Sequence, residues 1–231
     1  MSKRRFLVTG GSQGIGAAVV AAARAGGNEV VFTGRNESLI AETTKDTGAH
    51  GLRADVASSE DNARTVDVCR ERMGGVDVLV NNAGYGYFAQ IGDLDLGKMK
   101  EQFETNVFGL VDLTNRVVGE MKERGDGDIV NIASTSGMKG HAHGTSYSAS
   151  KWAVRGITQC WQAELRPHGI RVVCICPSEV QTNWGGRVGR NNPNKLFASD
   201  IADAIMAVLS AERRALWPEF AVFATNPWRE D

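Results

Sequence analysis

A glycine-rich loop between a short apolar run and an alanine-rich helical stretch is the feature that most limits how this chain can fold. The apolar run covers residues 6–8 and the helical stretch covers residues 17–25. A strand, a glycine loop and a helix in this order are typical of a parallel α/β sheet that binds a dinucleotide. Glycine permits the tight turn and the close approach of a pyrophosphate, and the helix N-terminus supplies amide donors. We therefore predict that Gly10, Ser12, Gln13, Gly14, Ile15 and Gly16 bind the cofactor, with the pyrophosphate close to the Gly14 backbone and Gly16 allowing the helix to pack against the strand.

Strand-like and helical segments alternate along the rest of the chain. The expected strands are residues 6–8, 29–33, 50–54, 76–80, 129–133, 172–175 and 219–224. The expected helices are residues 17–25, 39–47, 59–72, 97–124, 147–165 and 200–211. Near-continuous apolar runs such as 76–80 suit strands that are buried on both faces. The pattern predicts an α/β fold with a doubly wound parallel sheet (Rossmann fold), in one domain over residues 1–231 with a polar flap at about 183–198.

Composition narrows the class of protein. A formal net charge of −1 gives no electrostatic reason to expect nucleic acid or an anionic membrane as a partner. No apolar run approaches the ~20 residues that span a bilayer, and the N-terminus does not resemble a signal peptide. The four cysteines lack zinc-ligand spacing, so we expect no metal site and interpret Cys174 and Cys176 as small buried hydrophobes. We expect a cytoplasmic protein.

Tyr147 and Lys151 are the candidate proton-transfer pair. Four residues apart on an expected helix, they lie on the same face. A phenol has a pKa near ~10 and is a poor proton shuttle at neutral pH. A nearby ammonium should lower that pKa toward neutral, where acid–base transfer is efficient. The hydroxyl of Ser134 can then hold a substrate carbonyl oxygen while Tyr147 protonates it; the alternative is a helix pair with a solvated lysine.

Further polar candidates follow the ends of successive strands. Ligands of open parallel sheets bind outside the carboxyl ends of the strands. The glycine loop follows the first expected strand, and the ends of the next five are followed by Arg35, Asp55, Asn82, Ser134 and Thr182. The expected topology therefore brings all of these residues to one edge of the sheet.

With these motifs the chain resembles the short-chain dehydrogenase/reductase family, of the classical type, over about residues 5–224. The matching motifs are Thr9-Gly10-x-x-x-Gly14-x-Gly16, Asp55-Val56, Asn81-Asn82-Ala83-Gly84, Asn106, Ser134, Tyr147-x-x-x-Lys151 and the segment from Pro177 to Thr182. Seven motifs in family order and spacing make the resemblance specific.

The resemblance implies a catalytic tetrad of Asn106, Ser134, Tyr147 and Lys151. In it Tyr147 is the acid/base, Ser134 orients the carbonyl, Lys151 binds the nicotinamide ribose and tunes Tyr147, and Asn106 holds a water that relays protons. It also implies that Tyr147 and Lys151 contact the cofactor, together with Asp55, Val56, Asn82, Ala83, Gly84, Pro177, Val180 and Thr182.

The residues after the second expected strand bear on cofactor choice. An acidic residue that would bind the ribose hydroxyls of NAD is missing there, and Arg35 offers a guanidinium to a 2′-phosphate. This favours NADP(H) over NAD(H), which stays possible. Two positions depart from the family pattern: Gln13 replaces a common basic residue, and Ser178 replaces the glycine after Pro177. Arg35 therefore carries the preference alone.

The predicted activity is NADPH-dependent reduction of a ketone or aldehyde, or the reverse alcohol oxidation. The substrate wall should come from residues 85–91, 136–145 and 178–197, with Tyr85, Tyr87, Phe88, Met138 and Trp184 making it apolar. His141 and His143 are expected on surface loops, with this pocket as the alternative.

Two other functions fit the sequence. Arg187, Arg190 and Lys195 would suit a 3-oxoacyl thioester (acyl-carrier-protein) reductase. A non-catalytic NADP-sensing regulator would be expected to lose Tyr147 or Lys151, which this chain keeps. Residues 107–118 and 152–161 carry more apolar surface than one sheet face needs, and the family resemblance implies that such helices pair in a homodimer or homotetramer.

Overall fold

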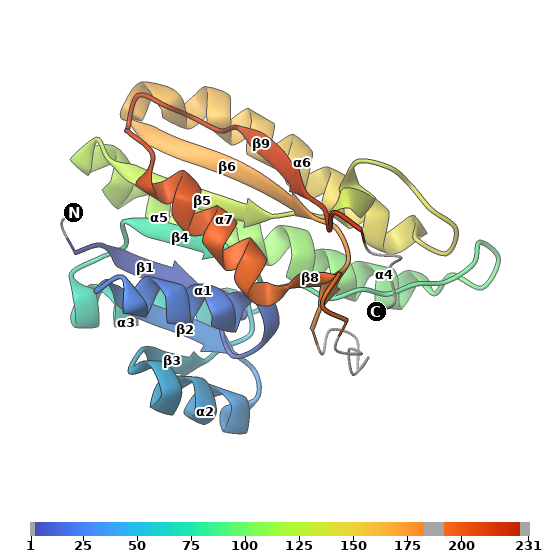
Figure 1. Cartoon of the computed structure of the whole chain (residues 1–231), viewed down its shortest axis with the longest axis horizontal. Helices are drawn as coiled ribbons and strands as arrows, with labels where there is room; N and C mark the ends of the chain where they lie inside the picture. The colour runs from blue at the N-terminus through green and yellow to red at the C-terminus, as the bar shows by residue number, and fades with distance from the viewer. Residues whose placement is uncertain (1–2, 183–191, 227–231) are drawn as a thin grey trace.

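Seven parallel strands form a twisted sheet with helices on both faces (Figure 1). The computed structural model describes residues 3–182 and 192–226. The strand order is β3-β2-β1-β4-β5-β6-β9, and every neighbouring pair is parallel. The strands are β1 (Arg5–Val8), β2 (Glu29–Gly34), β3 (His50–Arg53), β4 (Val78–Asn81), β5 (Gly127–Ile132), β6 (Ile170–Pro177) and β9 (Glu219–Val222). The predicted doubly wound sheet is confirmed.

The helices divide between the two faces of the sheet. Apolar side chains of α1, α2 and α7 pack in one core cluster, and those of α3, α5 and α6 pack in another. Strand residues alternate between them: Phe6 and Val8 of β1 belong to the first cluster and Leu7 to the second. This double burial explains the near-continuous apolar runs. The helices are α1 (Gly14–Ala25), α2 (Glu37–Thr47), α3 (Ser59–Met73), α4 (Leu96–Phe103), α5 (Gly109–Arg124), α6 (Thr145–Leu165) and α7 (Ala198–Ser210).

The strand order reverses between β1 and β4, and one threonine ties these two strands together. The chain builds outward from β1 to β3 and then returns to β4 on the other side of β1. Thr9 Oγ1 accepts hydrogen bonds from the amides of Asn82 and Ala83, each at 3.0 Å, and Asn82 Nδ2 donates to the Thr9 carbonyl at 2.9 Å. Connections leave in opposite directions at such a point, which creates a crevice for a ligand.

The long helix expected over residues 97–124 contains a π-helical turn. α4 continues through π-helical Glu104–Phe108 into α5. Asn106 lies in this turn, where its side chain accepts from the Tyr85 amide and donates to the Tyr85 carbonyl and Ser150 Oγ, each at 3.0 Å. One extra residue in a helical turn is often found at functional sites. The sequence pattern located the helix and missed this turn.

Two short strands were not predicted. β7 (Val180–Gln181) and β8 (Leu196–Phe197) pair in parallel at the base of the expected flap, of which residues 183–191 lie outside the described residues. The Gln181 side chain strengthens the pair, because it donates to the Asn192 carbonyl and accepts from the Asn192 amide, each at 2.7 Å. Two-residue strands give no periodic signal in a sequence. Among the helices described, none has both the length and the apolar character that crossing a membrane requires.

Candidate active site

A cleft of about 1760 Å³ runs along the carboxyl ends of the strands. It is lined by nearly all of the predicted site residues: Gly10, Ser12, Gln13, Gly14, Ile15, Arg35, Asp55, Val56, Asn82, Ala83, Gly84, Ser134, Tyr147, Lys151, Pro177, Val180 and Thr182. Gly16 and Asn106 are not among the lining residues, and each packs behind it.

The glycine loop brings the first amides of α1 to one end of this cleft. Gly10 and Gly14 have φ values of 63° and 56°, which favour glycine. A Cβ on Gly16 would lie 2.2 Å from the Gly10 carbonyl oxygen, so this glycine allows α1 to pack against the loop. The side chain of Gln13, which precedes α1, makes no capping hydrogen bond, and the first amides of α1 remain available to an anion. These residues fit the pyrophosphate of a dinucleotide.

Arg35 and Asp55 face one another farther along the cleft. Arg35 Nη1 lies 3.6 Å from Asp55 Oδ2, and their side chains are 66% and 39% exposed. The pair is solvated and loosely held. A Cβ on Gly34 would lie 2.5 Å from Ser12 Oγ, so the glycine at the end of β2 makes room for the phosphate loop. An arginine, and no carboxylate, follows β2 at this point.

Tyr147 reaches the cleft from the first turns of α6. Burial raises the pKa of its phenol, and a hydrogen bond with Ser134 acts in the opposite direction. Phe88 packs against the ring, with the two ring centroids 5.3 Å apart. The tyrosine is therefore a protonated phenol at neutral pH, in contact with the serine hydroxyl that was expected beside it.

Lys151 is buried, with 6% of its surface exposed, and its ammonium lies at the carboxyl edge of the sheet. Nζ donates to the Ile132 carbonyl at the end of β5 at 2.8 Å, and it lies 5.8 Å from the centroid of the Tyr147 ring. Burial lowers the pKa of this lysine to about 8. We predicted that Lys151 lowers the pKa of the Tyr147 phenol, and in the protein alone this is wrong. Burial disfavours the charged forms of both Tyr147 and Lys151. This effect outweighs the stabilisation that a nearby ammonium gives to the phenolate.

Asn106 lies directly behind the cleft wall. A Cβ on Gly84 would lie 3.0 Å from Asn106 Oδ1 and 3.6 Å from Lys151 Nζ, so the asparagine is close to the lysine. Its side-chain amide is engaged by Tyr85 and Ser150, as described above. The water relay through Asn106 stays a prediction, and this geometry assigns the side chain to holding Tyr85.

Only some of the residues that we expected in the substrate wall line the cleft. Tyr85 and Phe88 line the cleft, whereas Tyr87 and Met138 are not among the lining residues. Trp184, Arg187 and Arg190 lie outside the described residues. His141 and His143, which we expected on surface loops, are exposed and line the cleft, and His141 Nε2 lies 3.2 Å from Ser136 Oγ. On the other wall, Lys195 Nζ pairs with Glu179 at 3.0 Å.

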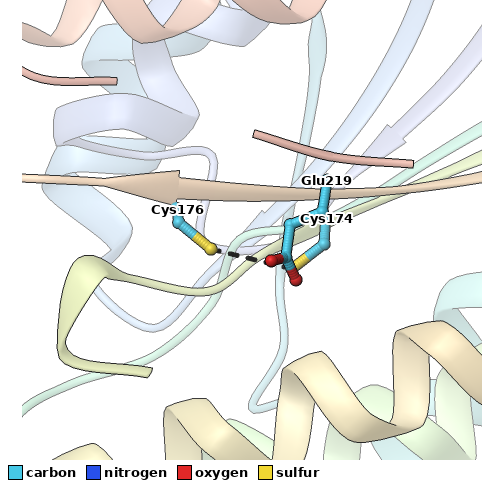
Figure 2. A group of neighbouring side chains, drawn as sticks. All are labelled: Cys174, Cys176 and Glu219. Carbon is cyan, nitrogen blue, oxygen red and sulfur yellow. Dashed lines mark hydrogen bonds between the residues drawn. The ribbon is translucent and has the colours of Figure 1, made fainter. Parts of the chain in front are cut away.

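Two thiols and a carboxylate gather behind Ser134, between β6, β9 and α6. Cys174, Cys176 and Glu219 place one ligand atom each within 4.8 Å of one another (Figure 2). Both Glu219 oxygens accept hydrogen bonds from Arg155. The hydrogen bond with Cys176 and burial raise the pKa of Cys174, which keeps it a neutral thiol. Cys174 and Cys176 are buried among apolar side chains, as their spacing predicted, and the convergence of Arg155 and Glu219 on them was not foreseen.

Comparisons with known proteins agree with this arrangement. The family model for short chain dehydrogenases matches residues 4–193. The chain belongs to this family. An uncharacterized oxidoreductase of Staphylococcus saprophyticus is 35% identical over 209 residues, which cover 88% of this chain and 89% of that protein.

Two solved structures extend the likeness to the whole short-chain dehydrogenase fold. One is an alcohol dehydrogenase from the archaeon Thermococcus sibiricus in complex with 5-hydroxy-NADP, with a TM-score of 0.88, 25% identity and 100% coverage of both chains. The other is the closed form of a serine dehydrogenase complexed with NADP+, with a TM-score of 0.89, 26% identity and 94% coverage of both chains. The chain is therefore an oxidoreductase of a family that binds NAD(P).

We expect Lys151→Met to raise the free energy of unfolding at pH 7 by on the order of 1–3 kcal/mol, because it removes a buried ammonium. The gain over wild type should shrink as the pH rises from about 8, the pKa of the folded lysine, toward the 10.5 of an unperturbed lysine. Over that interval the unfolded chain holds the proton that the folded chain has released, so the wild type becomes more stable. Urea unfolding at pH 7, 9 and 10 measures this. A difference between the two proteins that does not vary with pH would contradict the assignment.

Proposed function

We propose that this protein is an NADPH-dependent carbonyl reductase, or alcohol dehydrogenase in the reverse direction, that acts on a ketone or aldehyde. One observation carries the proposal: Ser134, Tyr147 and Lys151 line the same cleft as the glycine loop, whose helix has no side-chain cap. A phenol and a hydroxyl in one cleft can provide two donors for one carbonyl oxygen. The non-catalytic alternative has less support, since Tyr147 and Lys151 are both kept and both face the cleft.

In this mechanism the chain positions the carbonyl and supplies the proton. When bound, the nicotinamide supplies the hydride. Ser134 donates a hydrogen bond to the carbonyl oxygen, and Tyr147 transfers its phenolic proton to that oxygen. The raised pKa of Tyr147 keeps this proton in place until negative charge develops on the oxygen. Lys151, with a pKa of about 8, can give up and regain a proton near neutral pH.

A preference for NADP(H) is supported by Arg35. Its guanidinium is mostly exposed at the end of β2 and pairs only loosely with Asp55, so it is free to turn toward a 2′-phosphate. The two structural relatives described above were solved with NADP or an NADP derivative. Of the three basic residues that suggested a thioester substrate, Lys195 lines the described cleft and pairs there with Glu179, and Arg187 and Arg190 lie outside the described residues. Because Glu179 already neutralises Lys195, we propose a simple ketone or aldehyde as the substrate.

We further propose that the protein is a homodimer or homotetramer. Phe108 at the π-helical turn and Trp152 on α6 are 55% and 49% exposed. Large apolar side chains at such exposure are typical of interfaces between subunits. Light scattering at micromolar concentration should give the mass of two or four chains, and Phe108→Glu should shift it toward one. A wild-type mass of one chain would contradict this proposal.

We expect Tyr147→Phe to lower kcat for NADPH-dependent reduction by on the order of 10²–10⁴-fold, because it removes the general acid and leaves the ring in place. The Kd for NADPH should stay within about twofold, since the substitution removes one hydroxyl at most from the cofactor contacts. Stopped-flow turnover and NADPH fluorescence titration measure the two quantities. Turnover by the variant at the wild-type rate would refute the acid role.

We expect Arg35→Ala to weaken NADPH binding by about 10- to 100-fold, the value of one or two charge-assisted hydrogen bonds to phosphate. Binding of NADH should change by less than about threefold, because NADH lacks the 2′-phosphate. Fluorescence titration of both cofactors against both proteins is the measurement. An equal loss for the two cofactors, or none for either, would show that Arg35 does not recognise the phosphate.

A further inference from the structure

We propose that Arg155 and Glu219 are positioning residues that fix Ser134 against α6, a role that rests on the carbonyl reduction proposed above. Neither side chain is among those that line the cleft. They act from behind it, through the turn that begins at Ser134.

Arg155 makes three directed hydrogen bonds with a single guanidinium. It lies one helical turn after Lys151 on α6. Nε and Nη2 donate to the two Glu219 oxygens at 2.8 and 2.6 Å, and Nη1 donates to the Gly137 carbonyl at 2.5 Å. The two side chains are 15% and 24% exposed. The two bonds to the Glu219 carboxylate hold the planar guanidinium of Arg155 in one orientation. A lysine could not reproduce this bidentate arrangement.

The Gly137 bond acts on Ser134 because both belong to one short turn. Ser134 precedes the 3-10 turn Thr135–Gly137, its Oγ accepts from the Ser136 amide at 3.1 Å, and its carbonyl accepts from the Gly137 amide at 2.9 Å. The far end of the turn packs on α6, since a Cβ on Gly137 would lie 2.7 Å from the Lys151 carbonyl oxygen. Arg155 therefore ties the turn that carries Ser134 to the helix that carries Tyr147.

Glu219 and the two thiols complete the support from the sheet. Glu219 opens β9 and pairs in register with Cys174 of β6. The Cys176 thiol lies near the Ser134 amide, which acts to lower the pKa of that thiol, and the Cys174 and Cys176 sulfurs are 4.0 Å apart (Figure 2). The neighbouring Ala133 amide donates to the Ile175 carbonyl of β6 at 2.8 Å, so the segment is held by β6 through this bond and by β9 through Glu219, Arg155 and Gly137.

The same chain contains a matched arrangement far from the cleft. Arg5 donates from Nε and Nη2 to the two Asp77 oxygens and from Nη1 to the Gly74 carbonyl. Its side chain and that of Asp77 are 22% and 18% exposed, close to the values for Arg155 and Glu219. Arg5 begins β1, at the amino ends of the strands, opposite the cleft. Arg5→Met therefore removes the same set of bonds as Arg155→Met without touching the site.

The first test compares turnover in these two variants. Arg155→Met should lower kcat by on the order of 10- to 100-fold, because a displacement of about 1 Å at a reacting group costs as much. NADPH affinity and KM should stay within about threefold of wild type, because the cofactor cradle and the substrate wall keep their contacts. Arg5→Met should keep the wild-type kcat. Glu219→Gln, which preserves shape, should lower kcat in the same direction and takes the place of Arg155→Met if that variant does not fold. An unchanged kcat in the Arg155 or Glu219 variant, or an equal loss in Arg5→Met, would overturn the proposal.

The second test does not depend on turnover. Amide hydrogen exchange of residues 134–138 should be faster in Arg155→Met and Glu219→Gln than in wild type, and unchanged in Arg5→Met. If wild type reduces no carbonyl, the proposed function fails, and this measurement still decides whether Arg155 holds the turn. Exchange in residues 134–138 that is equal in all four proteins would overturn the positioning role.

Discussion

A buried ammonium is the interaction on which the rest of the site depends. Lys151 donates to the last carbonyl of β5 and joins α6 to the sheet where the cleft opens. Nζ is within a few ångströms of Gly84, behind which Asn106 and its π-helical turn lie. Burial at this position lowers the pKa of the amine to about 8, so the charged lysine lowers the free energy of unfolding. Groups with a perturbed pKa cluster at functional sites, which agrees with the role that we propose for Lys151.

The polar groups in the two halves of the cleft are arranged differently. At the glycine loop the fold leaves the first amides of α1 without a side-chain cap, and an anion can satisfy them. At the end that holds Ser134 and Tyr147, several polar side chains are already bonded within the protein. Asn106 bonds Tyr85 and Ser150, Lys151 donates to the Ile132 carbonyl, and Arg155 donates to the Gly137 carbonyl. One half is open to receive a ligand, and the other has these polar groups ordered before a ligand arrives.

The turn that begins at Ser134 is bonded by side chains that the family motifs do not contain. Arg155 and Glu219 are separated by 64 residues, and only the pairing of β9 with β6 brings them together. The thiols of β6 then fill the space between this ion pair and Ser134. The cluster has the residue types of a metal site, yet its carboxylate is committed to a guanidinium and Cys174 stays protonated. Its geometry suits support of the serine turn.

The sequence by itself determined that the chain forms a doubly wound parallel sheet, and it identified most of the residues at the carboxyl edge of that sheet. Apolar periodicity, glycine placement and motif spacing carry this information because they are local properties of the chain. Gly10, Ser134, Tyr147 and Lys151 could all be named in this way. The tertiary structure alone decided the ionisation of Tyr147 and Lys151, since desolvation depends on everything packed around a group. It alone revealed the π-helical turn, the β7–β8 pair and the bonds of Arg155, and it decided that the two histidines line the cleft, which the sequence had left as an alternative. Each of these depends on contacts between segments far apart in the chain, for which a single sequence carries no local signal.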